Sequence, residues 1–162
     1  QARPHARYVG IDVVPEFEQH WQARRAHNLN FQIADALAFT GFAQMSLVVS
    51  LFAVQFLPER RKRELPGRVH TGLVKGGALI IAEKILANSA RFQDALTFDY
   101  YDFKAKRFTA AEILEKERQL RGQMRLWTEQ ELVEALLEAG FKFERLQRFF
   151  QRQLFIAYVA IK

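Results

Sequence analysis

The sequence has 162 residues, of which 49% are hydrophobic and 26% are charged. This apolar content can bury one sizeable core, and the charged fraction is too ordinary for a disordered chain, so we expect a single folded domain. The net charge of +6 favours encounter with phosphate-rich partners such as RNA. No RNA-binding motif is visible, however, and an ordinary basic surface explains the charge as well.

The cysteine and histidine content of the chain argues against several kinds of site. The chain has no cysteine, which excludes disulfides, thiolate zinc sites and a cysteine nucleophile and suits a cytoplasmic protein. The four histidines show no metal-ligand spacing. The longest apolar run, residues 46–57, is too short to cross a bilayer. We therefore expect a cytoplasmic protein with no metal site and no membrane span.

The first half of the chain contains four candidate strands. Residues 7–14, RYVGIDVV, read as a buried strand that ends in Asp12, and a second short strand ends in Asp35. Residues 45–52 form a third strand, whose continuous apolar run is typical of strands covered on both faces. Residues 76–84 form the next strand, which begins at a Gly-Gly turn.

Helical patterns lie between these strands. Residues 16–27 have helical spacing, and Pro58 opens a second helix that Pro66 kinks or divides. We interpret the charged run ERRKRE at 59–64 as a solvated helical face. Strands that alternate with helices at this pitch predict a parallel sheet built from βαβ units.

The second half has a different organisation. Residues 88–125 read as two helices, and a third helix begins where Thr128 and Glu131 form a capping box. Gly140 occupies the position of its C-terminal cap. Residues 141–162 contain two β-rich runs that are close enough in sequence to pair antiparallel.

Two of the predicted strands end in an acid, Asp12 and Asp35. In open α/β sheets ligands bind outside the carboxyl ends of the strands, and an acid at such an end holds the ribose of a bound nucleoside. Each acid also has a purely structural alternative. Asp12 could serve only to cap the helix that starts near Pro15, and Asp35 could serve only to form a turn before ALAF.

The order of these segments resembles the class I S-adenosylmethionine-dependent methyltransferase fold. Residues 50–84, 99–124 and 132–141 resemble successive segments of the carboxy-S-adenosyl-L-methionine synthase family, which serves wobble-uridine modification of tRNA. The most specific part is QFLPERR followed by GGALIIAEK and DFK. The resemblance implies a Rossmann-like α/β sheet with a C-terminal antiparallel strand pair, a helical insertion at about 88–125, and S-adenosyl-L-methionine as cofactor.

The resemblance also implies a set of cofactor-binding residues. Asp12 matches the acid that accepts hydrogen bonds from both ribose hydroxyls, and Val13 matches the residue beside the adenine. Asp35 matches the acid that receives the adenine amino group, with the backbone N–H of Ala36 reaching a ring nitrogen. Leu51 stands where the family has an asparagine and offers no polar side chain.

On the substrate side, Glu83 is the candidate catalytic residue because it ends a predicted strand at the mouth of the site. Tyr100 and Tyr101 are candidate substrate residues, although packing of the helical insertion over the sheet explains them as well. Methyl transfer needs mainly alignment of nucleophile and methyl group, so the class requires no conspicuous catalytic motif.

Enzymes of this family bind the extra carboxylate of carboxy-S-adenosylmethionine through an arginine in the helical insertion. Aligned without a gap, that position is Glu117, whose carboxylate would repel the group. Arg118 is adjacent and Arg121 lies one turn further on, so a local shift of the alignment assigns the role to one of them.

The glycine-rich loop of this fold follows a first strand, which lies between the strand of Asp12 and the strand at 45–52. The sequence contains no such segment, so we expect a sheet with its first strand missing and a chain truncated at its N-terminus. Our hypothesis is an S-adenosylmethionine-dependent methyltransferase that acts on a small molecule or tRNA and forms a homodimer. The alternative is a non-catalytic module of the same fold, used for binding or dimerisation.

Overall fold

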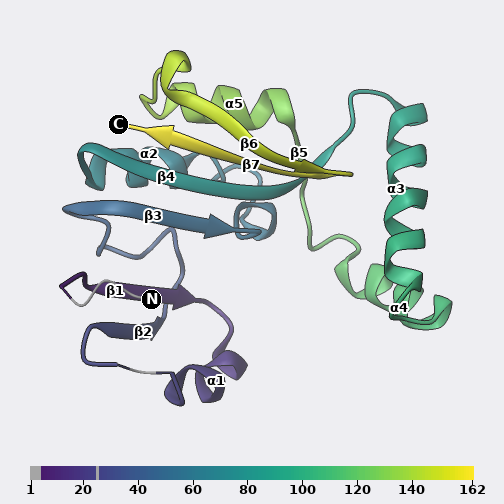
Figure 1. The fold of residues 1–162 in the computed structure, drawn as a ribbon, viewed down its shortest axis with the longest axis horizontal. Helices are drawn as coiled ribbons and strands as arrows, with labels where there is room; N and C mark the ends of the chain where they lie inside the picture. Colours follow the sequence, from purple (N-terminus) through teal and green to yellow (C-terminus); the bar gives the residue numbers. More distant parts are fainter. Residues whose placement is uncertain (1–4, 25) are drawn as a thin grey trace. The chain divides into compact units, whose positions relative to one another are not determined.

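The computed structural model describes residues 5–24 and 26–162. The chain forms two compact units, Gln1–Gly41 and Phe42–Lys162, and each has its own secondary structure (Figure 1).

The first unit is a small βαβ arrangement. Its elements are β1 (Tyr8–Asp12), the 3-10 helix η1 (Pro15–Phe17), α1 (Glu18–Gln22) and β2 (Leu29–Ile33). β1 and β2 pair in parallel along their whole length, from Tyr8 with Leu29 to Asp12 with Ile33. The Trp21 ring of α1 stacks on Phe31 of β2 at 5.5 Å between centroids, and this contact packs the helix on the strand pair.

The second unit contains the larger sheet. Its elements are β3 (Met45–Leu51), η2 (Val54–Phe56), α2 (Glu64–Gly72), β4 (Leu73–Leu86), α3 (Ala90–Ala105), α4 (Ala110–Leu120), β5 (Trp127–Thr128), α5 (Glu129–Glu138), η3 (Phe143–Arg145), β6 (Leu146–Arg152) and β7 (Phe155–Ile161). The strand order is β3-β4-β7-β6, and the short β5 pairs with β4.

The direction of the strands confirms an α/β fold with a mixed sheet. β3 and β4 run parallel, whereas β7 is antiparallel to both β4 and β6, as predicted for the C-terminal strand pair. Within the described residues, β1 pairs with no strand except β2, and β3 is an edge strand.

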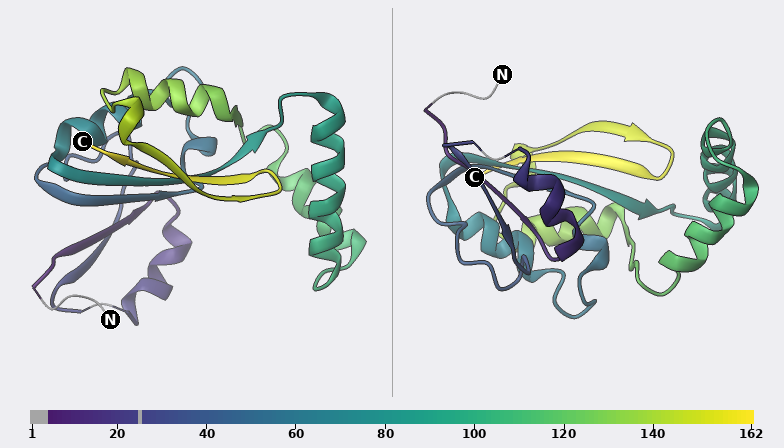
Figure 2. Two further views of the ribbon diagram at one scale, coloured as in Figure 1. Left: turned by 45° about the horizontal axis from the view of Figure 1, so that its top comes forward. Right: turned by 90° about the horizontal axis from the view of Figure 1, so that it is seen from below.

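The core of the second unit lies between the sheet and the helices α2 and α5, which cover one face of it (Figure 2). Leu132 and Leu136 of α5 are completely buried, as is Ile156 of β7. α5 begins at the predicted capping box, in which the Thr128 hydroxyl accepts the Glu131 N–H and the Glu131 carboxylate accepts the Thr128 N–H at 2.7 Å. The apolar face and the cap together place this helix against the sheet.

The predicted insertion consists of α3 and α4. α3 starts at Ser89, whose hydroxyl accepts the Phe92 N–H, and α4 starts at a second capping box, between Thr109 and Glu112. α3 has no buried residue, in contrast to α5.

Three predictions needed correction. The helix expected from Pro58 begins only at Glu64, because residues 58–63 form turns; Pro66 then lies in its first turn, where proline is tolerated. The Gly-Gly pair at 76–77 does not launch a strand but forms an irregularity inside β4, where Gly76 has φ +76° and the pairing with β3 shifts register. The helix expected over 16–27 is the short pair η1 and α1.

No helix in the described part of the chain is long and apolar enough to cross a membrane.

Candidate functional site

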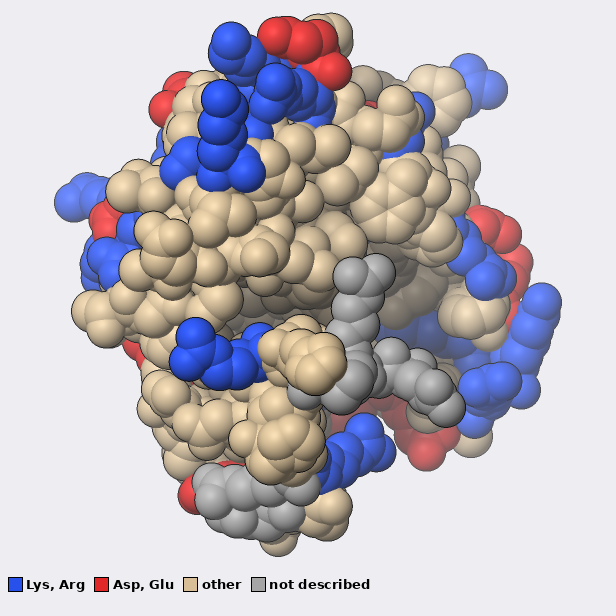
Figure 3. All heavy atoms as spheres, turned by 60° about the vertical axis from the view of Figure 1, so that its left-hand side comes forward, with Lys and Arg blue, Asp and Glu red and all other residues tan. Residues whose placement is uncertain are grey.

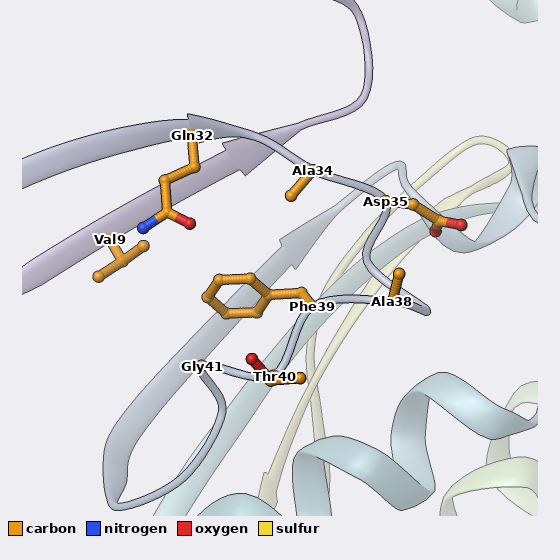
Figure 4. A pocket seen from close by; sticks show the side chains of 8 residues that line it. All are labelled: Val9, Gln32, Ala34, Asp35, Ala38, Phe39, Thr40 and Gly41. Carbon is orange, nitrogen blue, oxygen red and sulfur yellow. The ribbon is translucent and has the colours of Figure 1, made fainter.

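A cavity of about 460 Å³ lies in the first unit, at the carboxyl end of β2. Its lining residues are Val9, Gln32, Ala34, Asp35, Ala38, Phe39, Thr40 and Gly41. Figure 4 shows the Phe39 ring pointing toward Val9 and Gln32, with Asp35 at the opposite end of the lining. The cavity therefore combines an aromatic ring and aliphatic groups with one acid.

Asp35 takes part in a turn at one end of this cavity. Its Oδ1 accepts the Leu37 N–H at 2.8 Å, and its backbone carbonyl accepts the N–H groups of Ala38 and Phe39. Leu37 is buried, which anchors the turn. The local interpretation of Asp35 is thus correct for one carboxylate oxygen, while Oδ2 has no hydrogen-bond partner among the described residues and is available to a ligand.

Asp12 has the same arrangement at the end of the neighbouring strand. Its Oδ1 accepts the Val14 N–H at 2.9 Å, which forms a local turn rather than a cap on η1, since the N-cap residue is Val14. The Asp12 carbonyl accepts the Ala34 N–H, and this bond fixes the two strand ends beside each other. Val13 is 64% exposed, so its side chain is free to contact a ligand.

The end of β3 in the second unit is apolar. Leu51 is 60% exposed, and Phe52 next to it adopts φ +56°, a left-handed conformation that is uncommon for an aromatic residue. The Phe52 N–H donates to the Ala82 carbonyl at 2.8 Å, and its ring packs edge-on against Phe155. Sequence reasoning missed Phe52, because glycine or asparagine normally marks such a position.

Glu83, the candidate catalytic residue, points into the protein. It is only 3% exposed, and its two carboxylate oxygens accept the N–H groups of Val54 at 3.0 Å and Gln55 at 3.2 Å. Burial raises the pKa of Glu83 to about 7, although these hydrogen bonds and the charge of Lys62 oppose the increase. This geometry favours a structural role, in which Glu83 holds η2 against β4.

Gln55 and Lys62 extend this buried polar network, and sequence reasoning missed both. The Gln55 amide oxygen accepts the Lys84 N–H, and its carbonyl accepts the Arg125 N–H at 2.7 Å. Lys62 is completely buried: its Nζ donates to the Arg125 carbonyl, pairs with Glu59 at 2.9 Å, and lies 5.0 Å from the centre of the Trp127 ring. The interpretation of residues 59–64 as a solvated face is therefore wrong for Lys62.

The candidate substrate residues of the insertion fall into two groups. Tyr100 and Tyr101 are half-buried and lie close to Lys104, which forms an ion pair with Glu117 at 3.0 Å. Arg118 and Arg121 are exposed, and Arg118 pairs with Glu115 on its own helix at 3.6 Å. The structure thus brings Tyr100, Tyr101 and Glu117 together, but not the two arginines.

The surface has no single basic patch on the face drawn in Figure 3. Lys and Arg side chains stand there in separate groups, and Asp and Glu lie beside several of them. The described residues also contain no group of three or more His, Asp or Glu side chains that would hold a metal ion.

Comparison with known proteins adds independent information. No protein-family model matches the chain. It is 30% identical over 160 residues to the carboxy-S-adenosyl-L-methionine synthase of Trichodesmium erythraeum, covering 95% of this chain and 62% of that protein. It is 27% identical to the enzyme of the same name from Staphylococcus epidermidis, covering 98% of this chain and 69% of that protein.

A solved structure supports the fold. Human N-acetylserotonin methyltransferase in complex with S-adenosylmethionine superimposes with a TM-score of 0.60 at 17% identity, covering 98% of this chain and 41% of that one. The chain spans about 62% of the length of the Trichodesmium relative.

Proposed function

We propose that this chain binds S-adenosyl-L-methionine and transfers its methyl group to a small molecule or tRNA. Distant homology to carboxy-S-adenosyl-L-methionine synthases over nearly the whole chain, together with the methyltransferase fold, supports the proposal. The observation that carries the proposal is the pair of acids Asp12 and Asp35. Asp12 ends β1, and Asp35 follows the parallel strand β2. Each has one carboxylate oxygen in a local turn and one without a described partner.

In this proposal the first unit holds the nucleoside. Asp12 accepts hydrogen bonds from the ribose diol, and Asp35 accepts one from the adenine amino group. The backbone N–H of Ala36 donates to a ring nitrogen, and Val13 packs on the adenine. Leu51 carries no hydrogen-bonding side chain, and we assign it no part in this nucleoside site.

The chemistry requires little from the protein beyond orientation. The cofactor supplies a methyl group on a positively charged sulfur. The chain would align the acceptor with that methyl group and exclude water, and a base is needed only when the acceptor loses a proton. Glu83 is a poor candidate for this base, because both of its oxygens are hydrogen-bonded inside the protein.

Calorimetric titration of S-adenosylmethionine, and separately of S-adenosylhomocysteine, tests the proposal. We expect micromolar binding that is lost in Asp12→Ala, since the ribose diol then has no acceptor. Glu16→Ala is the matched control, because Glu16 is an exposed acid of the same unit. Equal binding by the two variants, or no binding by the folded wild-type protein, contradicts the proposal.

A second candidate is a non-catalytic binding or dimerisation module of the same fold. Leu51 favours it, because an apolar side chain replaces the polar group that the family uses at this strand end. Such a module binds no methyl donor, or binds it without turnover.

We also propose that the two units act as one domain and that the chain is cytoplasmic, with tRNA modification as the process it would serve.

We further propose a homodimer formed through α3. This 16-residue helix has no buried residue, and Phe92 and Phe98 on it are 65% and 67% exposed. Large exposed aromatic side chains along one helix are typical of a protein interface.

A further inference from the structure

A cluster of cations and aromatic rings lies near the carboxyl end of β4, outside the proposed nucleoside site. The Lys84 Nζ lies 5.5 Å from the centre of the Tyr100 ring, and the Lys104 Nζ lies 4.5 Å from the same ring. Lys104 also lies 5.9 Å from the Tyr101 ring. One tyrosine ring therefore contacts two ammonium groups, one from β4 and one from α3.

The charges of this cluster are not balanced. Lys104 pairs with Glu117, but no described carboxylate lies within ion-pair distance of Lys84. Burial lowers the pKa of Lys84, and the Lys104 charge adds to this effect while Glu117 opposes it. A half-buried ammonium group with insufficient counter-charge is unfavourable, and an anion placed beside it would remove the penalty.

The rings beside these lysines form a partly exposed aromatic cluster. Tyr100 packs against Phe155 at 5.0 Å between centroids and stacks with Phe103 at 6.5 Å with an interplanar angle of 18°. The Arg152 guanidinium lies 4.3 Å from the Phe103 ring centre and adds a third cation. Cations that lie over partly exposed rings suit a ligand that carries both an aromatic part and a negative charge.

We propose that Lys84 and Lys104 together bind an oxyanion, a carboxylate or a phosphate, that is carried by the methyl acceptor and not by the methyl donor. This inference rests on the proposed function and names the chemical class of its acceptor. Lys84 lies two residues before the end of β4, at the edge where open α/β sheets bind their ligands. Two ammonium groups give the oxyanion charge-assisted hydrogen bonds, and the rings of Tyr100 and Phe103 support the rest of the acceptor.

Titration of benzoate and of phenyl phosphate, followed by NMR of ¹³C-labelled lysine side chains, tests the inference. We expect the Lys84 and Lys104 signals to shift and saturate, and the tighter of the two probes identifies the oxyanion. Lys84→Met should weaken binding about tenfold through the loss of one charge-assisted hydrogen bond. Lys106→Met, which removes an exposed lysine just beyond α3, should leave the affinity unchanged.

Glu117→Gln gives a sharper test, because it should tighten binding of both probes by removing the carboxylate that pairs with Lys104. A merely structural role of the cluster does not predict tighter binding. Lys104→Met serves as the second lysine variant if Lys84→Met does not fold. The inference is wrong if neither probe saturates, or if Lys84→Met and Lys106→Met have equal affinities.

Titration of S-adenosylmethionine into the same proteins separates this inference from the proposed function. We expect its affinity to be the same in Lys84→Met as in wild type. If the methyl donor binds and the probes do not, the inference fails alone. If the wild-type protein does not bind the donor, the proposed function fails, and the probe titrations still decide whether the lysine pair binds an oxyanion.

Discussion

Replacing Glu83 with glutamine should change how the stability of the protein depends on pH. The buried carboxyl has its pKa raised from 4.5 to about 7, so the folded protein binds a proton at Glu83 more tightly than the unfolded chain does. Its contribution to stability is therefore complete below pH 4.5 and is lost as the pH rises toward about 7. Between these values the free energy of unfolding should fall by about 1.4 kcal/mol per pH unit, or about 3 kcal/mol in total.

Glutamine cannot ionise, so this loss is absent in Glu83→Gln. Its amide oxygen still accepts one backbone N–H, but its amide nitrogen faces the other, which adds a constant cost of about 1–3 kcal/mol. Urea unfolding of both proteins at several pH values measures the difference. We expect the wild-type advantage to shrink by about 3 kcal/mol as the pH rises through this range. A difference in the free energy of unfolding that does not change with pH would contradict this prediction, because the Glu83 carboxyl would then not titrate in this range.

The remaining predictions concern the core, a helix cap, the adenine acid and the dimer. Leu136→Ala should lower the free energy of unfolding by about 2–5 kcal/mol in urea titrations, because the side chain is fully buried. Thr128→Ala should lower the free energy of unfolding by about 0.5–2 kcal/mol through loss of the α5 cap, and an unchanged midpoint of the urea transition would contradict this. Asp35→Asn should weaken S-adenosylmethionine binding in calorimetry. The same substitution should reduce the affinity for inosine-based donors less, because they lack the adenine amino group. Phe98→Asp should give a monomer in sedimentation velocity, and an unchanged sedimentation coefficient would exclude α3 as the interface.

Local signals in the sequence predicted the regular elements well. Both ends of α5 could be predicted, because the signals depend only on neighbouring residues: the capping box at Thr128 and Glu131, and the glycine at 140. The antiparallel pairing of β6 and β7 followed from two β-rich runs separated by a short turn. The acids at the ends of β1 and β2 were also visible, because a strand that stops at an aspartate has a local pattern.

The buried polar network could not be predicted in this way. Lys62 lies in a run of charged residues that looks like a solvated surface, and only the fold brings it to Glu59, Trp127 and the Arg125 carbonyl. Glu83 follows an apolar run as a site residue would, but it lies inside β4, and its orientation depends on N–H groups that lie 28 and 29 residues away in sequence. Long-range contacts of this kind leave no periodic signal in the chain.

In our proposal the ends of β1 and β2 hold the nucleoside of S-adenosylmethionine. The most direct test is ¹⁵N NMR of the backbone amides during titration with S-adenosylhomocysteine, which carries the same nucleoside. We expect saturable shifts concentrated at Asp12, Val13, Asp35 and Ala36, with the amides of α5 unaffected. Shifts confined to the second unit, or no shifts in a folded protein, would contradict it.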